Sequence, residues 1–559
     1  MTTGRTRGAK AGRSTRTATV LVAMAPACVA LAFASASSAA TLQVCPHGCQ
    51  YSQIAAAVAA ARGGDHVTVA AGTYQGGFTI RVSLTLTGAG ASQTIIKGGG
   101  PVVTVGAGGS SKLNVAISGV TITGGVAHSS PDSADLYGPA GVLASGGGIE
   151  ITPDNITTSP TTGATVVVSN SVITGNSVAP TAHVPSPAGA QCPGGPNYPG
   201  GTCKFADAFG GGIYNAGDLT LTNTTVADNS SVSTFASDAG GGGIYNEMGS
   251  LTVINSTIST NRTGVTAPYG RYADGGAIVC AGGTLTIRGS SISDNTASTI
   301  TAWPSSVDPE AHGGAIHVET GNATPTGHAT ISHTKITGNT VKMTNSVGAA
   351  FADSGGLKAD LAMTVTDDVI ADNHVVVAAL GSGSADGDSG AGELWGTVTG
   401  TRLTDNTVTV SARKGDALAS SGASLIQANL TDSLVSGNHV RAISAGGSAM
   451  ADAGGIQVSG GVSGPVAETL RSTPVSDNTA RATARGATAQ GGGVFDIAIQ
   501  NGPPGGVLTL INSNVSDNTL SGSANAKLQG GAVFTTFKLT LTNSALTANT
   551  PGECAGSGC

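Results

Sequence analysis

The chain repeats one pattern of apolar and polar positions, and its clearest copy is residues 210–229. Gly-Gly-Ile213 opens that copy, Leu-Thr-Leu221 follows, and Val226 stands three residues before the closing Asn229. The closing asparagine recurs eleven times, mostly 31 to 44 residues apart. The closing residues are Asn176, Asn229, Asn261, Asn295, Asn339, Asn373, Asn406, Asn438, Asn478, Asn518 and Asn549. Repetition at such a period decides the fold before individual strands are assigned.

A second position recurs six residues before each closing asparagine. Ten of its eleven occupants are Asn, Asp, Gly or His, which tolerate a positive φ better than other residues. They are Asn170, Asn223, Asn255, Gly289, His333, Asp367, Gly400, Asp432, Ser472, Asn512 and Asn543. Each copy is therefore predicted to hold two sharp corners with a short strand between them.

Units this similar predict a coil that returns to its starting position at each turn, with every strand paired in parallel to its equivalents above and below. The apolar positions then form continuous inner columns. The asparagines fit inside the corners, where an amide can bond the backbone of the next coil. We expect about thirteen or fourteen coils over residues 65–549 and, at roughly 4.8 Å per coil, a length on the order of 65 Å.

The Gly-Gly-x-Ile and Val-x-x-Asn pairing resembles the polymorphic outer-membrane protein repeat, within the right-handed parallel β-helix proteins of pectin lyase-like fold. Residues 54–88, with Asp65-His-Val67 and Gly72-Thr-Tyr74, are similar to the opening of the carbohydrate-active members of that fold. Two features depart from the repeat family: Val, Ile or Leu replaces its Phe before the Asn, and no membrane barrel follows. The resemblance implies an all-β, right-handed parallel β-helix. It leaves function open, because the fold hosts lyases, hydrolases, esterases and adhesins.

The two ends of the chain differ from the repeats. Residues 1–40 combine five basic residues, an apolar run and small residues, which is typical of a secretion signal too short to span a bilayer. Residues 41–64 are predicted to form an N-terminal cap whose helix covers 51–62, with Ser52 as its N-cap. Residues 550–559 form a cysteine-containing tail.

The net charge of the chain argues against one class of binding partner. Without the signal, 20 basic and 32 acidic residues remain, a net charge of −12, which disfavours nucleic acid as a partner.

In an exported protein, three close cysteine pairs predict three short disulfide loops. The pairs are Cys45 with Cys49, Cys192 with Cys203, and Cys554 with Cys559. Cys280 has no such partner and is predicted to be a buried free thiol. Cys28, within the signal, is the alternative: a cysteine for lipid attachment.

Candidate catalytic groups are scattered. The closest acidic candidates are Asp367-Asp368 and Asp386-Gly-Asp388. Asp367 falls on a corner and is interpreted as a turn former, and Asp368 is expected to point into the following loop. A second group is rich in histidine and acid: Glu310, His312, His317, Glu319, His328 and His333. Imidazole and carboxylate side chains can bind zinc or exchange protons. His317 and Glu319 share the outward parity of one strand, and chance grouping on the surface is the alternative.

An acidic column precedes the glycines in several copies. Asp238, Asp274 and Asp353 are its metal candidates, because stacked coils would bring carboxylates together and calcium prefers all-oxygen ligands. Asp207, Asp388 and Asp452 belong to the same column. The alternative is that Asp suits the turn from loop to strand.

The residue after the opening apolar position faces outward in every copy, and five of its eleven occupants are aromatic. Tyr214, Tyr245, Lys358 and Trp395 are the ligand-binding candidates, since stacked rings along a sheet can carry sugars. Two alternatives stay open: aromatic residues favour sheet surfaces in general, and the long loops could bury these rings.

These observations predict a secreted or cell-surface, adhesin-like β-helix protein, a monomer that binds polysaccharide or surface glycans without cleaving them. The first alternative is a polysaccharide lyase or glycoside hydrolase, and the second is a structural rod without a specific ligand. An acid–base set on one sheet would favour the enzyme, and an exposed aromatic strip without one would favour binding.

Overall fold

A computed structural model describes the chain over residues 39–106, 112–128, 143–152, 163–180, 184–185, 204–234, 238–267, 270–304, 309–320, 327–459, 467–497 and 507–559. The chain divides into two units, Met1–Ser38 and Ala39–Cys559, and all described residues belong to the second. Residues 1–38 of the predicted secretion signal, which include Cys28, therefore lie outside the described residues.

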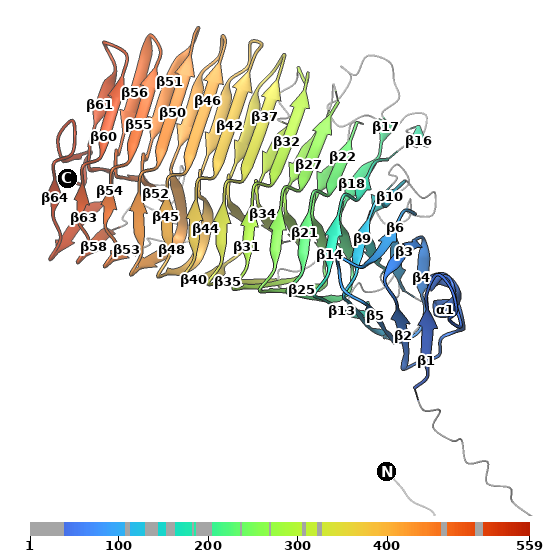
Figure 1. The fold of residues 1–559 in the computed structure, drawn as a ribbon. Coiled ribbons are helices and arrows are strands. Elements are labelled where there is room, and N and C mark those ends of the chain that lie inside the picture. Colours follow the sequence, from blue (N-terminus) through green and yellow to red (C-terminus); the bar gives the residue numbers. More distant parts are fainter. Residues whose placement is uncertain are drawn as a thin grey trace, which may run out of the picture. The chain divides into compact units, whose positions relative to one another are not determined.

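One coil of the second unit consists of five short strands, shown stacked in Figure 1. In the coil that begins at Ile244 they are β24 (Ile244–Glu247), β25 (Ser250–Ile254), β26 (Thr257–Ser259), β27 (Arg262–Thr266) and β28 (Tyr272–Asp274). The next coil opens with β29 (Ile278–Ala281), which pairs in parallel with β24. Leu251 is paired with Leu219 below and Leu285 above, so equivalent residues of successive coils form columns.

Four long sheets result, here named A to D, and all of their pairings are parallel. Within the described residues, sheet A has 27 strands, two in most coils, and sheet B has 14, from β3 (Gly72–Gln75) to β64 (Leu546–Thr547). Sheets C and D have 11 strands each and begin at β10 (Val126–Ala127) and β11 (Leu143–Ser145). An antiparallel pair, β16 (Val184–Pro185) with β17 (Lys204–Phe205), stands apart from them. The predicted parallel β-helix, with a short helix near its start, is confirmed.

The apolar columns form the core of the coils. Ile213, Leu219, Leu221 and Val226 are each at most 1% exposed. Sheets C and D extend from the coils and pack on each other, and in Figure 1 they are the long strand pairs, such as β50 (His439–Ser444) with β51 (Ser448–Asp452). Their shared core consists of alanines and valines with few larger residues, because two sheets with small inner side chains can approach closely.

The asparagine column is continuous and buried. The backbone N–H of Asn229 donates to Asn261 Oδ1 (3.0 Å), and the amide of Asn261 donates to the Val226 carbonyl (2.9 Å). The same bonds recur from Asn176 to Asn549. The predicted asparagine ladder is confirmed.

All eleven predicted first-corner residues have a positive φ, between 47° and 64°. At the second corner, the left-handed residue is the one before the asparagine, such as Asp228 (φ 55°) or Thr260 (φ 53°), so the asparagine itself is not strained. Asn246, which is not part of the asparagine ladder, is also fully buried, and its amide donates to the Gly249 carbonyl.

A second ladder lies beside the first corner and was not predicted. The N–H of Thr224 donates to Ser256 Oγ (3.1 Å), and the N–H of Ser256 donates to Ser290 Oγ (3.2 Å). Asp368 occupies this column and accepts the N–H of Thr334 (2.6 Å), so the expectation that it points into a loop is wrong. Its neighbour Asp367 has φ 56°, which confirms that it forms the turn.

The terminal elements join the same stack. β1 (Thr41–Val44) pairs in parallel with β2 (Asp65–Val69), and β65 (Cys554–Ala555) pairs with β62 (Val533–Thr535). Sheet A therefore extends beyond 65–549 at both ends.

The helix α1 (Ile54–Ala60) is shorter than predicted. Gln53 is its N-cap and no side chain caps it, so the assignment of Ser52 is wrong. Within the described part of the chain, no helix is long and apolar enough to cross a membrane.

Two of the three predicted disulfides are present, Cys45–Cys49 and Cys554–Cys559. The third predicted pair, Cys192 and Cys203, lies outside the described residues. Cys280 is a buried free thiol, as predicted.

Candidate functional site

Two columns of side chains face each other where sheet D turns into sheet A. The D column is the last residue of each D strand: Ser145, Phe209, Gly240, Asp274, His312, Asp353, Asp388, Ser420, Asp452, Gln490 and Gln529. The A column is the outward residue of each following strand: Glu150, Tyr214, Tyr245, Val279, His317, Lys358, Glu393, Ser424, Gln457, Phe495 and Phe534. The register of the sheets thus places both columns within side-chain reach of each other.

Glycines make the turn between the columns sharp. Gly275 has φ +54°, and a Cβ there would lie 2.2 Å from the Ile278 carbonyl oxygen. In other coils the same turn position holds Ser354, Ser389, Ser421 or Ala453, also with a positive φ of 46° to 62°, so a left-handed turn before each of these A strands brings the D column against the A column.

The N-terminal part of the facing columns is aromatic. The rings of Tyr214 and Tyr245 stack with centroids 5.9 Å apart, and Phe209 of the D column stacks on Tyr245 at 4.4 Å. Tyr214 and Tyr245 are only 4% and 7% exposed, so the expectation of an exposed aromatic strip is wrong. Their parity is outward as predicted, but the D column covers them.

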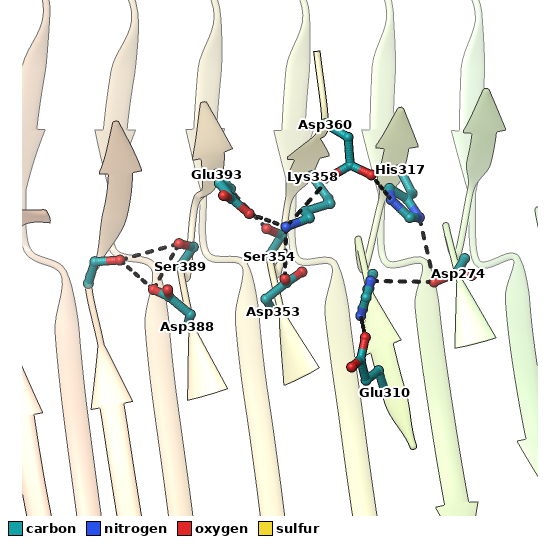
Figure 2. Close-up of polar contacts among 12 residues, drawn as sticks. Asp274, Glu310, His317, Asp353, Ser354, Lys358, Asp360, Asp388, Ser389 and Glu393 are labelled. Carbon is teal, nitrogen blue, oxygen red and sulfur yellow. Dashed lines mark hydrogen bonds and ion pairs between the residues drawn. The ribbon is translucent and has the colours of Figure 1, made fainter. Parts of the chain in front are cut away.

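The middle part is ionic, and Figure 2 shows its contacts. Asp274 ends β28, His312 ends β33 (Glu310–His312), and His317 lies on β34 (Ile316–Glu319). Nδ1 of His317 and Nδ1 of His312 lie 3.5 Å and 3.8 Å from the same atom, Asp274 Oδ1. The opposite ring nitrogens face two further carboxylates, Glu310 at 2.9 Å from His312 Nε2 and Asp360 at 3.6 Å from His317 Nε2.

The contacts with carboxylates shift the pKa values of the side chains in this ionic part. Burial alone would lower the pKa of the His317 imidazole, but the carboxylates of Asp274 and Asp360 raise it well above its usual range. Burial raises the pKa of Glu319, which the charge of His317 only partly offsets. The site therefore holds charges that are stabilised mainly by one another.

Lys358 of β39 (Leu357–Ala359) is the cation of the next coil. Its Nζ lies 3.0 Å from Asp353 and 3.8 Å from Asp360, and it also bonds Glu393. Burial would lower the pKa of Lys358, but the charges of Asp353 and Glu393 raise it. Burial also raises the pKa of Glu393 to about 7, against the effect of Lys358.

A pocket of about 480 Å³ opens between the two columns. It is lined by Phe209, Asp238, Gly240, Tyr245, Tyr272, Asp274, His312, His317, Glu319, Lys358 and Asp360. We call it the D–A pocket. Its aromatic lining lies at the N-terminal side of the stack and its ionic lining at the C-terminal side.

Asp238, which lines this pocket, forms an acidic pair with Asp207, whose Oδ1 accepts the backbone N–H of Asp238 (3.2 Å). Burial, and then the charge of Asp207, raise the pKa of Asp238 to about 7, while Arg271 opposes the shift. The guanidinium of Arg271 lies 3.8 Å from Asp238 and sits over the ring of Tyr272, 4.8 Å from its centroid. Arg271 therefore holds both an acid and a ring of the pocket in place.

The predicted site residues divide between this pocket and other places. His317, Glu319, Asp238, Asp274, Tyr245 and Lys358 line the pocket. Asp388 does not, and its carboxylate accepts hydrogen bonds from Ser389 (3.0 Å) and Ser421 (2.8 Å). Asp353 is bound to Lys358, and the register separates it from Asp274 by His312. The three acids proposed for calcium thus do not converge on one point.

Trp395 lies outside the A column. Gly392, rather than Leu394, pairs with Leu357, so Glu393 takes the position expected for the tryptophan. The difference of two residues preserves parity, and Trp395 still faces outward on β44 (Gly392–Thr399), where it is half-buried.

Four lining or supporting residues were missed from the sequence: Phe209, Tyr272, Arg271 and Asp360. They precede or follow the repeat motif at positions with no fixed residue type. The spacing of the D strands is the signal that could have identified the first two, because Phe209 lies four residues before Ile213 and Tyr272 six residues before Ile278.

The sequence matches no family model and no curated protein significantly. Solved structures that it resembles include the A-modules of two mannuronan C-5 epimerases of Azotobacter vinelandii. The AlgE6 module is 14% identical with a TM-score of 0.24, covering 90% of this chain and 96% of that one; the AlgE4 module is 12% identical with a TM-score of 0.23, covering 91% and 96%. A complex of alginate lyase AlyF-OU02 with G6 is 9% identical with a TM-score of 0.25, covering 93% and 94%. Likeness at this level carries no argument, so the fold rests on the strand pairing.

Proposed function

We propose that the mature protein binds a polysaccharide in the D–A pocket. The observation that carries the proposal is the lining of this pocket, in which aromatic rings and charged hydrogen-bonding groups face one space of about 480 Å³. Sugars have apolar C–H faces that pack on rings and hydroxyls that bond to carboxylates and amines. A pocket of this size and mixed lining is typical of a small-ligand site.

The charge of the lining favours a neutral polymer over a polyuronate. Asp238, Asp274, Glu319 and Asp360 line the pocket. Its lysine, Lys358, is already paired with Asp353, Asp360 and Glu393. Its His317 lies against Asp274 and Asp360. A uronate carboxylate would meet like charge there, which costs binding energy in a partly buried site.

A lyase or hydrolase is the second candidate, and one observation favours it. The expectation of binding without cleavage depended on the absence of an acid–base set beside the ligand site. The pocket holds Glu319, Asp360 and Lys358 within one lining, and such groups serve in general acid–base catalysis.

We further propose that the protein acts outside the cytoplasm, as an adhesin-like monomer. The secretion-signal pattern of residues 1–40 and the disulfides Cys45–Cys49 and Cys554–Cys559 support an oxidising compartment.

The test is a glycan array of neutral and acidic polysaccharides probed with the purified mature chain, with each bound polymer then incubated and assayed for new reducing ends and unsaturated sugars. The proposal expects binding to a neutral polymer and no product. Product formation would establish the enzyme instead, and no binding to any polymer would contradict both candidates.

A further inference from the structure

We infer that Asp274, His312 and His317 form a binding site for one divalent transition-metal ion of the zinc type. The site is a property of the chain that is independent of the polysaccharide proposal.

The positions of the three residues follow from the fold. Asp274 and His312 are register partners on adjacent D strands. His317 stands five residues after His312, across the Gly313-Gly314 turn and on sheet A. The turn thus places a third ligand opposite the first two.

The distances fit a metal better than direct hydrogen bonds. Asp274 Oδ1 lies 3.5 Å and 3.8 Å from the two Nδ1 atoms, and one ligand atom from each residue lies within 4.8 Å of the others. Hydrogen bonds between these atoms would measure about 2.7–3.2 Å. Ligand atoms bound to zinc at about 2.0–2.1 Å in a tetrahedron lie about 3.3 Å apart.

Both rings are oriented as metal-binding histidines are. Each turns Nδ1 toward Asp274 and Nε2 toward a different carboxylate, Glu310 or Asp360. A carboxylate behind the second nitrogen fixes the tautomer and the ring orientation of a metal ligand. The two rings are inclined by 62°, so their Nδ1 atoms approach from different directions.

Burial supplies an independent observation. The His317 side chain is 6% exposed, and within the described residues neither of its ring nitrogens, nor Asp274 Oδ1, has a hydrogen-bond partner of acceptable geometry. Buried polar atoms without partners are costly. A metal ion would coordinate Nδ1 and the carboxylate together and remove most of that cost.

The chemistry of the three ligands indicates which metal ions the site would bind. Two imidazoles and one carboxylate suit zinc and its first-row neighbours, whereas calcium takes six to eight oxygens. Three protein ligands leave a further position, and all three residues line the D–A pocket. That position is therefore open to water or to a ligand oxygen.

The test uses the untagged mature chain after treatment with a chelator, titrated with Zn²⁺ by calorimetry and with Co²⁺ by visible absorption. One ion per chain is expected, with Co²⁺ bands typical of a four-coordinate site. His317→Ala and His312→Ala should each weaken binding by at least about 100-fold, and Glu310→Gln by about 10- to 100-fold, because Glu310 only positions His312.

His439→Ala is the matched control, since that exposed ring bonds Thr479 at 2.7 Å, away from the site. It should leave metal binding unchanged. Circular dichroism establishes that each variant is folded, and His312→Ala decides the result if His317→Ala is not. If neither Zn²⁺ nor Co²⁺ binds, Asp274, His312 and His317 form an ion-pair network and not a metal site. Binding that survives His312→Ala, or that His439→Ala weakens equally, would also overturn the inference.

Discussion

Replacing Asn261 with alanine tests whether the asparagine ladder stabilises the coils. The side chain takes part in four hydrogen bonds, each 2.9 or 3.0 Å long. Without it, the buried N–H of Asn229 loses the partner described for it, and the Val226 carbonyl loses a donor. The orphaned N–H costs about 1–3 kcal/mol and each of the three further lost bonds about 1 kcal/mol, so the free energy of unfolding should fall by about 4–6 kcal/mol.

The matched control is Asn114→Ala, because Asn114 is exposed on β8 (Asn114–Ser118). That change should alter stability by less than about 0.5 kcal/mol. Unfolding in urea, followed by circular dichroism, measures both variants. Amide hydrogen exchange of residues 225–233 should show faster local opening in Asn261→Ala alone. Equal stability and equal exchange in the two variants would refute the ladder's role.

Three further predictions concern buried charges and thiols. Burial, and then the charge of Asp388, raise the pKa of Asp452 to about 8. The folded chain therefore keeps a proton on Asp452 that the unfolded chain releases near pH 4. The stability that this group contributes is lost as the pH rises from about 4 to 8. Asp452→Asn should flatten that part of a plot of melting temperature against pH, and parallel curves for the two proteins would exclude Asp452 as the cause. Lys358→Met leaves the buried carboxylate of Asp353 without its cation and should lower the free energy of unfolding by about 3–5 kcal/mol. The control Lys97→Met, at an exposed position of β6 (Thr94–Lys97), should have little effect. Similar unfolding curves for the two variants would show that the pairing of Lys358 is not stabilising. Without reductant, the mature chain should titrate no thiol when native and one, Cys280, when denatured; three thiols on denaturation would show that Cys192 and Cys203 are unpaired.

The coil and its corners could be predicted because their signals are local and repeated. A closing asparagine such as Asn229 needs one residue type at one offset, and a first corner such as Asn223 needs a positive φ. Both requirements recur in the eleven coils from Asn176 to Asn549, so the sequence records each of them eleven times.

The candidate site could not be assembled from the same pattern. Tyr214 and Tyr245 were correctly placed on the outer face, but parity does not show that Phe209 and the rest of the D column lie over that face. Sheets C and D have few large side chains, and their contribution to the fold was not recognised.

The three residues of the proposed metal site could not be grouped from the repeat pattern either. Asp274, His312 and His317 come from three strands in three successive coils, with spacings of 38 and 5 residues that match no local motif. Only the register of sheet D makes Asp274 and His312 neighbours. His317 was singled out from its strand parity, but its partners depend on the tight turn at Gly313 (φ 57°).

The most direct test of the proposed function is calorimetric titration of the polymer identified on the array into the native chain, Tyr272→Ala and Trp395→Ala. Tyr272 lines the D–A pocket, whereas Trp395 is a half-buried aromatic residue of sheet A that is not part of the pocket lining. A sugar that covers about 40–80 Å² of one ring gains about 1–2 kcal/mol at about 25 cal/mol per Å², so Tyr272→Ala should weaken binding by about 5- to 30-fold and Trp395→Ala by less than about 2-fold. Equal affinity of Tyr272→Ala and the native chain, or a larger loss in Trp395→Ala, would contradict the placement of the polysaccharide in the D–A pocket.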